Sequence, residues 1–258
     1  MLVSSSKKIV RVILLLTIFL PLKIWSYDGL TIAVASNFNL TAEKLAAKFT
    51  LETKIPVIIS SASTSNLYAQ IINGAPYDIF LAADIERPKK LEEGKYAVSG
   101  TRQTYAVGAL TLWSSDSLFE NDQCSSAIYN GSFMKLAIAN PEIAPYGDAA
   151  REFLKRIGQW ESIQKKIVLG ENISQTYLFA ATGNVTFSLI SRAQAVAEQP
   201  IEPTCMWNVP SNMHTKIEQQ AVLLSKTKNP KKAKLFLDFL NTPAAVSIII
   251  DSGYLVIN

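Results

Sequence analysis

Three short polar segments interrupt the chain, and each follows an apolar run. They are residues 35–38, 60–65 and 140–147, and they contain serine, threonine and asparagine together with a Pro-Tyr-Gly string. Each lies where a strand is expected to end and an amphipathic helix to begin, so hydroxyl groups and free helix-end N–H groups gather there. Such groups favour a bound anion. The pattern therefore predicts an anion receptor.

The elements that would position these segments are apolar runs that alternate with helical periodicity. Expected helices lie between the strands, including one over residues 243–250 that Gly253 would end. This alternation predicts an α/β fold with mostly parallel pairing. The expected strands are residues 30–35, 56–59, 78–82, 105–113 (one long strand), 135–139, 167–169, 185–190 and 221–224.

The N-terminal residues indicate where the protein works. Lys7, Lys8 and Arg11 precede an apolar stretch over residues 12–22, which is followed by the small Ser26. This is typical of a secretory signal peptide, residues 1–26, that is removed on export. An uncleaved anchor is the alternative, but the stretch is shorter than the roughly 20 residues that a membrane-spanning helix needs.

Removal of residues 1–26 takes away four of the 25 basic residues and no acidic residue, which leaves 21 of each sign. A neutral mature chain lacks the basic face that nucleic-acid binding needs, so we predict no nucleic-acid partner. The lysine run over residues 228–234 is interpreted as a solvated helix surface. About 230 mature residues that are rich in apolar side chains can form two lobes.

Several reactive residues have both a structural and a functional interpretation. Cys124 and Cys205 could pair in an oxidising compartment, closing a loop of about 80 residues worth on the order of 4 kcal/mol, or each could be a lone buried thiol. His214, the single histidine, is expected on a surface loop rather than on a metal. Asp78 and Asp84 are expected to brace the hinge between the lobes.

Five strings resemble one protein family over almost the whole mature chain: residues 35–38, 68–80, 83–84, 105–108 and 139–147. The chain resembles the periplasmic molybdate-binding proteins of ABC importers, within the type II periplasmic binding fold. The resemblance implies two lobes, each a mixed, mostly parallel sheet flanked by helices, joined by two crossing hinge strands. Lobe I would comprise residues 27–106 and 218–258, and lobe II residues 107–217.

The resemblance also implies the ligand contacts. The donors for the oxyanion would come from both lobes, with Tyr146 and Ile173 contributing backbone N–H groups. A tyrosine that completes the pocket in some family members has no counterpart here. The implied ligand-binding residues are Ser36, Asn37, Thr64, Tyr146 and Ile173, with Ser63 and Ser65 as secondary candidates.

The chemistry of the ligand agrees with these residue types. Molybdate is a fully deprotonated dianion whose oxygens only accept hydrogen bonds, whereas hydrogen phosphate carries a proton that needs an acceptor. Glu142 and Glu171 lie near the donors in sequence, and we predict that both point away. Tungstate matches molybdate in size, so either metalate is a candidate. The family implies no cofactor and no metal beyond the molybdenum of the bound oxyanion.

The implied partner is the membrane permease of an ABC importer, and the receptor is expected to be a periplasmic monomer and not an enzyme. Other interpretations stay open. Ser36 and Asn37 could act as helix N-caps. The ligand could be sulfate, phosphate or chelated iron. A secreted serine hydrolase is the other class, but the chain lacks a Gly-x-Ser-x-Gly string and offers only His214 as a base.

Overall fold

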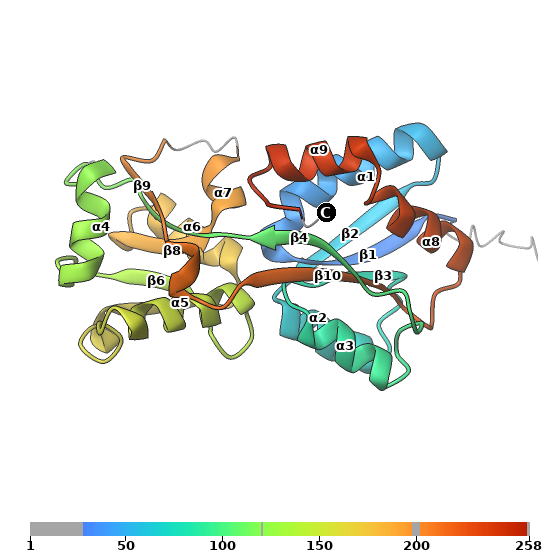
Figure 1. Cartoon of the computed structure of the whole chain (residues 1–258), viewed down its shortest axis with the longest axis horizontal. Coiled ribbons are helices and arrows are strands. Elements are labelled where there is room, and N and C mark those ends of the chain that lie inside the picture. The colour runs from blue at the N-terminus through green and yellow to red at the C-terminus, as the bar shows by residue number, and fades with distance from the viewer. Residues whose placement is uncertain (1–27, 120, 198–201, 257–258) are drawn as a thin grey trace, which may run out of the picture.

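The computed structural model describes residues 28–119, 121–197 and 202–256, so the predicted signal peptide, residues 1–26, lies outside the described residues. Two five-stranded sheets, each flanked by helices, form two lobes that lie side by side (Figure 1). The predicted two-lobed α/β architecture is therefore confirmed.

The first lobe is built on the strand order β2-β1-β3-β10-β4. Its strands are β1 (Leu30–Ala35), β2 (Val57–Ala62), β3 (Ile79–Leu81), β4 (Gln103–Gly108) and β10 (Ile217–Leu223). Its helices are the 3-10 turn η1 (Ser36–Phe38), α1 (Asn39–Thr53), α2 (Thr64–Ile72), α3 (Glu86–Glu93), α8 (Pro230–Phe239) and α9 (Pro243–Asp251).

The second lobe has the strand order β7-β6-β8-β5-β9. Its strands are β5 (Leu110–Ser114), β6 (Leu136–Ala139), β7 (Ile167–Gly170), β8 (Phe187–Ser191) and β9 (Cys205–Asn208). Its helices are α4 (Asn121–Asn130), α5 (Pro145–Arg156), η2 (Gln164–Lys166), α6 (Ile173–Ala181), α7 (Arg192–Val196) and η3 (Ser211–Met213).

The two sheets share one topology, although the sequence shows no internal repeat. In each sheet a parallel trio is extended by one antiparallel strand and a further edge strand. The trio is β2-β1-β3 in the first lobe and β7-β6-β8 in the second, and the antiparallel strands are β10 and β5. Four strands of each sheet therefore run the same way, which is the mixed, mostly parallel arrangement predicted.

The chain crosses between the lobes along two paths, which Figure 1 shows as β4 leading into β5 and β9 leading into β10. The expected single strand over residues 105–113 is wrong. It is two strands, β4 in the first sheet and β5 in the second, separated by Ala109. The pairing partner decides this, because β4 pairs with β10 whereas β5 pairs with β8 and β9.

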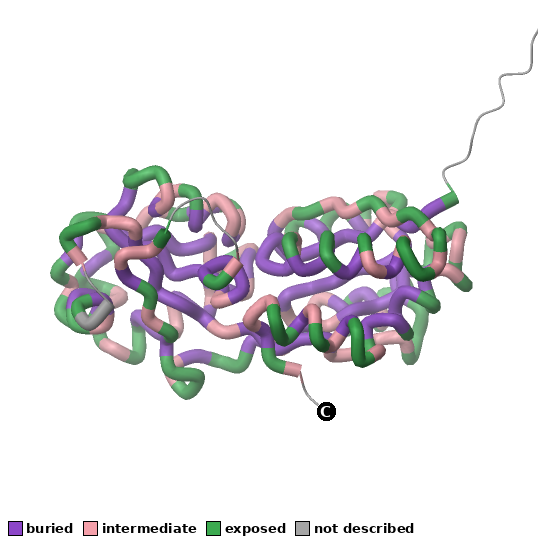
Figure 2. Tube along the Cα trace, turned by 90° about the horizontal axis from the view of Figure 1, so that it is seen from above, coloured by how far each residue is buried: buried purple, intermediate pink, exposed green. Residues whose placement is uncertain are grey.

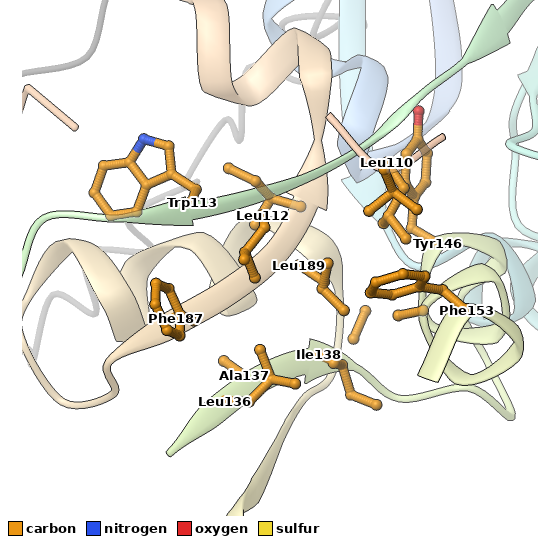
Figure 3. Packing of buried hydrophobic residues seen from close by; sticks show 14 of the residues in the cluster. Leu110, Leu112, Trp113, Leu136, Ala137, Ile138, Tyr146, Phe153, Phe187 and Leu189 are labelled. Carbon is orange, nitrogen blue, oxygen red and sulfur yellow. The ribbon is translucent and has the colours of Figure 1, made fainter. Parts of the chain in front are cut away.

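Each lobe has its own apolar core. β3, β5, β6 and β8 are buried at every residue, which fits strands covered by helices on both faces. Figure 2 shows the buried trace running through the sheets while the outer helical turns are exposed. In the second lobe the core includes Trp113, Phe187 and Phe153, and α5 contributes Tyr146 at its edge (Figure 3).

A disulfide joins Cys124 of α4 to Cys205 of β9, with Cα atoms 5.9 Å apart, a normal separation for a bridged pair. It ties the edge strand of the second lobe to a flanking helix. Among the described residues, no single helix is long and apolar enough to cross a membrane, and one bent pair, α8 with α9, meets the length and composition criteria together.

Candidate oxyanion-binding site

The site lies where parallel strands of both lobes end. In the first lobe β1 and β2 run parallel and in register from Leu30 and Val57, so their carboxyl ends place Ser36 and Ser63 at the same sheet edge. In the second lobe β6 and β7 run parallel, and the chain after them enters α5 and α6. This is the edge at which open α/β sheets bind ligands.

The structure brings the predicted residues of the two lobes together. A small, partly open pocket lies between the helix starts. All five implied ligand-binding residues line it, together with one of the two secondary candidates, Ser63. The lining residues are Ala35, Ser36, Asn37, Ser63, Thr64, Ala83, Ala144, Pro145, Tyr146 and Ile173.

Each helix start leaves backbone N–H groups without a carbonyl partner inside the helix. The first residues of α2 and α6 are Thr64 and Ile173, and Tyr146 is the second residue of α5, after Pro145. Proline suits this first position because it has no N–H to satisfy. With η1, four helix starts contribute positive potential to one small pocket.

Two side-chain hydroxyls at the start of α2 are available to a ligand. The Oγ1 atom of Thr64 accepts a hydrogen bond of 3.3 Å from the N–H of Ala83, so its own proton is free to point elsewhere. Ser63 is 2% exposed, and its Oγ atom has no hydrogen-bond partner among the described residues. An unpaired buried hydroxyl is costly, so its place in the pocket wall points to a ligand that accepts its proton.

Ser65, the other secondary candidate, does not line the pocket. Its Oγ atom is also buried and unpaired, but its backbone N–H donates across the lobes to the carbonyl oxygen of Ile143, at 3.2 Å. A second link across the lobes runs from the Oγ atom of Ser174 to the carbonyl oxygen of Ser36, at 3.4 Å. The pocket is therefore flanked by hydrogen bonds that join the lobes.

The N-cap interpretation of Ser36 and Asn37 is not supported. The N-cap positions of η1 and α1 are Ala35 and Phe38, and no side chain caps either start. The Nδ2 atom of Asn37 instead donates to Gln219, at 2.9 Å, and to Tyr254, at 3.1 Å. The side-chain amide of Asn37 is thus committed behind the pocket, and its backbone N–H is the group left for a ligand.

Three buried tyrosines surround the back of the pocket and stay neutral. Burial raises the pKa values of Tyr105 and Tyr146 well above the ordinary value for tyrosine, and burial also raises the pKa of Tyr254. The amides of Gln219 and Asn37 oppose this for Tyr146 only in part. No phenolate therefore forms near neutral pH, and no negative charge from these groups would repel an anion.

No charged side chain is among the described residues that line the pocket. Glu142 and Glu171 are both exposed, and Glu142 pairs with Arg151 at 2.6 Å, so the prediction that they point away is confirmed. A wider groove with charged side chains from both lobes, among them Asp84 and Lys216, adjoins the pocket. The pocket itself offers hydrogen-bond donors and neutral walls.

The remaining candidate residues lie elsewhere. Asp78 accepts from the N–H of Thr31 at 2.7 Å and from the hydroxyl of Thr227, so it is structural. It lies where β3 begins, at the opposite end of that strand from the pocket, and its carbonyl oxygen accepts from the N–H of Leu224, directly after β10, at 2.9 Å. Asp84 pairs with Arg87 at 2.6 Å, and burial raises the pKa of Asp84 against that pairing.

His214 corrects another expectation. It was expected on a surface loop, but the residue is only 6% exposed, and its Nδ1 atom lies 2.8 Å from the carbonyl oxygen of Thr215. The described residues contain no group of three or more histidine, cysteine or acidic side chains that could hold a metal ion.

Sequence reasoning did not single out four of the lining residues as contacts. Three are alanines, Ala35, Ala83 and Ala144, and the fourth is Pro145. All four stand within or beside the strings that carry the family resemblance. Their shared property is small size or a missing N–H, which lets the helix starts approach one another closely.

Helix starts from two lobes around a small pocket are the arrangement of a two-lobed binding protein. The chain belongs to the bacterial extracellular solute-binding proteins, whose family model matches residues 30–255. It is therefore a binding protein rather than an enzyme, as predicted.

Its relatives include two curated molybdate-binding proteins ModA. That of Rhodobacter capsulatus is 41% identical over 222 residues, which cover 86% of each chain. That of Azotobacter vinelandii is 39% identical over 223 residues, covering 86% of this chain and 88% of the relative. The solved periplasmic molybdate-binding protein of Azotobacter vinelandii superposes with a TM-score of 0.83 at 36% identity, over 89% of this chain and all of the other.

Proposed function

We propose that this protein is a periplasmic receptor that binds molybdate, and also tungstate, between its lobes and delivers it to the membrane permease of an ABC importer. The observation that carries the proposal is the pocket itself, in which four helix starts and the hydroxyls of Ser63 and Thr64 converge without a charged side chain among the described lining residues. The relatives named for molybdate support the same ligand.

The donor set matches a proton-free dianion. Molybdate oxygens accept hydrogen bonds and donate none, so a wall of N–H and O–H groups satisfies them. Hydrogen phosphate would leave its proton without an acceptor, because no carboxylate is among the described residues that line the pocket. Sulfate has the same charge as molybdate, and it is separated from molybdate by size, since molybdate has the longer bonds to oxygen.

Uncharged donors are sufficient to hold a dianion. Each hydrogen bond to a charged group contributes roughly 1.5–3 kcal/mol, and each helix start about 0.3–1 kcal/mol, more when it is partly buried. Several such contacts give useful affinity, and they avoid an arginine or lysine clamp that would slow release to the importer. This balance suits a transport receptor.

Closure of the lobes would couple binding to transport. We place the lobe boundaries at residues 27–106 with 218–258, and at 107–217, because these ranges follow the membership of the two sheets to within a few residues. The crossing segments β4 to β5 and β9 to β10 then act as the hinge. A ligand that contacts both lobes favours the closed form, which the permease accepts.

We also propose where the protein works and in what form. The protein is exported by a signal peptide, residues 1–26, that is cleaved in the mature form, and it acts in the periplasm as a monomer without a nucleic-acid partner. The family of extracellular solute-binding proteins supports this location.

The test is calorimetric titration of the mature chain with molybdate, tungstate, sulfate and phosphate. We expect both metalates to bind much more tightly than sulfate, and phosphate to bind weakest. At about 100 times the dissociation constant, molybdate should raise the free energy of unfolding by roughly 2.7 kcal/mol. Binding of phosphate or sulfate in preference to both metalates would overturn the proposal.

A further inference from the structure

Gln219 is a buried polar side chain behind the pocket to which the proposed function assigns no role. It is 0% exposed and lies on β10, one of the strands that lead from one lobe to the other. The register between β10 and β4 shifts here, because Gln219 pairs with Ala106 and Gln220 with Thr104, which leaves Tyr105 of β4 as an extra residue, as in a β-bulge. Bulges redirect side chains and are common next to functional sites. Because successive side chains of a strand point to opposite faces of the sheet, the consecutive glutamines Gln219 and Gln220 have different surroundings.

The carboxamide of Gln219 contacts the helix starts of both lobes. Its Oε1 atom accepts from the Nδ2 atom of Asn37, at 2.9 Å, and from the hydroxyl of Tyr105, at 3.1 Å. Its Nε2 atom donates to the hydroxyl of Tyr146, at 3.4 Å. Asn37 belongs to η1 in the first lobe, and Tyr146 to α5 in the second. One side chain therefore spans the two halves of the pocket wall.

The packing around this contact leaves little freedom. A Cβ atom on Gly108, at the end of β4, would lie 2.0 Å from the hydroxyl oxygen of Tyr146 and 2.9 Å from the Nε2 atom of Gln219. The absent side chain of Gly108 is what lets the ring of Tyr146 rest against the crossing strands. Figure 3 shows the phenol oxygen of Tyr146 pointing away from the apolar core. The ring acts as a rigid link between α5 and β10.

From these contacts we infer that Gln219 is a positioning residue that fixes the separation of the helix starts at Asn37 and Tyr146 when the lobes are closed, and thereby sets the size of oxyanion that the pocket accepts. The inference rests on the proposed function, because it concerns how that pocket tells molybdate from the smaller sulfate. Gln219 lies behind the pocket wall and is not among the lining residues, so it acts on the ligand only through Asn37 and Tyr146.

The test compares Gln219→Leu with Gln220→Leu. The control residue has the same type and lies on the same strand, but its amide bonds Arg102, at 2.9 Å, and Thr104, at 3.3 Å, both in the first lobe. Calorimetry gives the dissociation constants for molybdate and for sulfate. We expect Gln219→Leu to reduce the preference for molybdate over sulfate at least tenfold, because the lobes then close on the smaller ion without restraint. Gln220→Leu should keep that preference within twofold.

If Gln219 has a purely structural role, Gln219→Leu should weaken the binding of molybdate and of sulfate by the same factor. The preference for molybdate would then be unchanged, and the inference would be overturned. If Gln219→Leu fails to fold, Tyr146→Phe decides, because it removes only the hydroxyl that receives the bond from Gln219 and keeps the backbone N–H. We expect it to reduce the preference in the same direction, and an unchanged preference would overturn the inference. Wild-type protein that binds neither ion would instead overturn the proposed function.

Discussion

The two serines that flank Thr64 offer a matched pair for testing the pocket. Both Oγ atoms are buried and without a partner among the described residues, but only Ser63 lines the pocket. Ser63→Ala and Ser65→Ala remove the same atom from nearly the same place. In ligand-free protein neither change should lower the free energy of unfolding, because an unpaired buried hydroxyl costs about 1–3 kcal/mol rather than stabilising the fold.

The effect on ligand binding should separate the two variants. The hydroxyl of Ser63 is expected to donate to a doubly charged ligand, and such a bond is worth roughly 1.5–3 kcal/mol. Ser63→Ala should therefore weaken molybdate binding roughly 10- to 150-fold, since about 1.4 kcal/mol corresponds to a factor of ten. Ser65→Ala should bind with wild-type affinity, because its interlobe bond uses the backbone N–H, which alanine keeps.

Two measurements on each purified variant are needed. Urea unfolding without ligand reports the fold, and calorimetric titration with molybdate reports the site. Wild-type affinity in Ser63→Ala, or an equal loss of affinity in both variants, would show that the hydroxyl of Ser63 does not contact the ligand. A large loss of stability in ligand-free Ser63→Ala would show that the hydroxyl has a structural partner instead.

Three further predictions concern other parts of the site. Ser36→Ala should weaken molybdate binding by roughly 1.5–3 kcal/mol without unfolding the protein, and unchanged affinity in calorimetry would remove Ser36 from the site. Gly147→Ala should weaken molybdate binding at least roughly tenfold in calorimetry, because the new Cβ atom would lie 2.1 Å from the carbonyl oxygen of Ala139 and push the start of α5 away. Wild-type affinity for molybdate in this variant would contradict the prediction. Burial raises the pKa of Tyr254, so this residue keeps its proton in the folded protein while the unfolded chain loses it above about pH 10, and the free energy of unfolding falls as the pH rises further. In alkaline denaturation, Tyr254→Phe should make that fall shallower by up to about 1.4 kcal/mol per pH unit. Equal slopes of unfolding free energy against pH for the variant and the wild type would contradict this.

Much of the fold follows from local patterns in the sequence. The apolar run of residues 30–35 is β1 with the predicted bounds, and the helix expected over residues 243–250 is α9. Gly253 ends that helix with a φ of +90°, a conformation that glycine adopts without strain. These elements are predictable because hydrophobic period and capping residues act over only a few positions along the chain.

Other features depend on pairing with distant strands. Ser60 and Ser61 were expected in the polar segment after the strand over residues 56–59, but they belong to β2, where they pair with β1. The strand β9 was not expected at all, and it pairs with β5 beside the disulfide of Cys124 and Cys205. A strand in a sheet is specified as much by its neighbours as by its own residues, so short polar strands escape sequence patterns.

The candidate site, too, was predicted from the sequence only in part. Residue types and their place after strands predicted an anion site at the polar segments 35–38, 60–65 and 140–147, because the ends of parallel strands meet at one sheet edge. The family resemblance, and not the pattern, singled out Ser36, Thr64 and Tyr146 within them. The tertiary structure alone decided that Ser63 faces the pocket and Ser65 does not. It also decided that Gln219 joins the two halves, since a bulge and a contact between residues 182 positions apart leave no trace in local sequence.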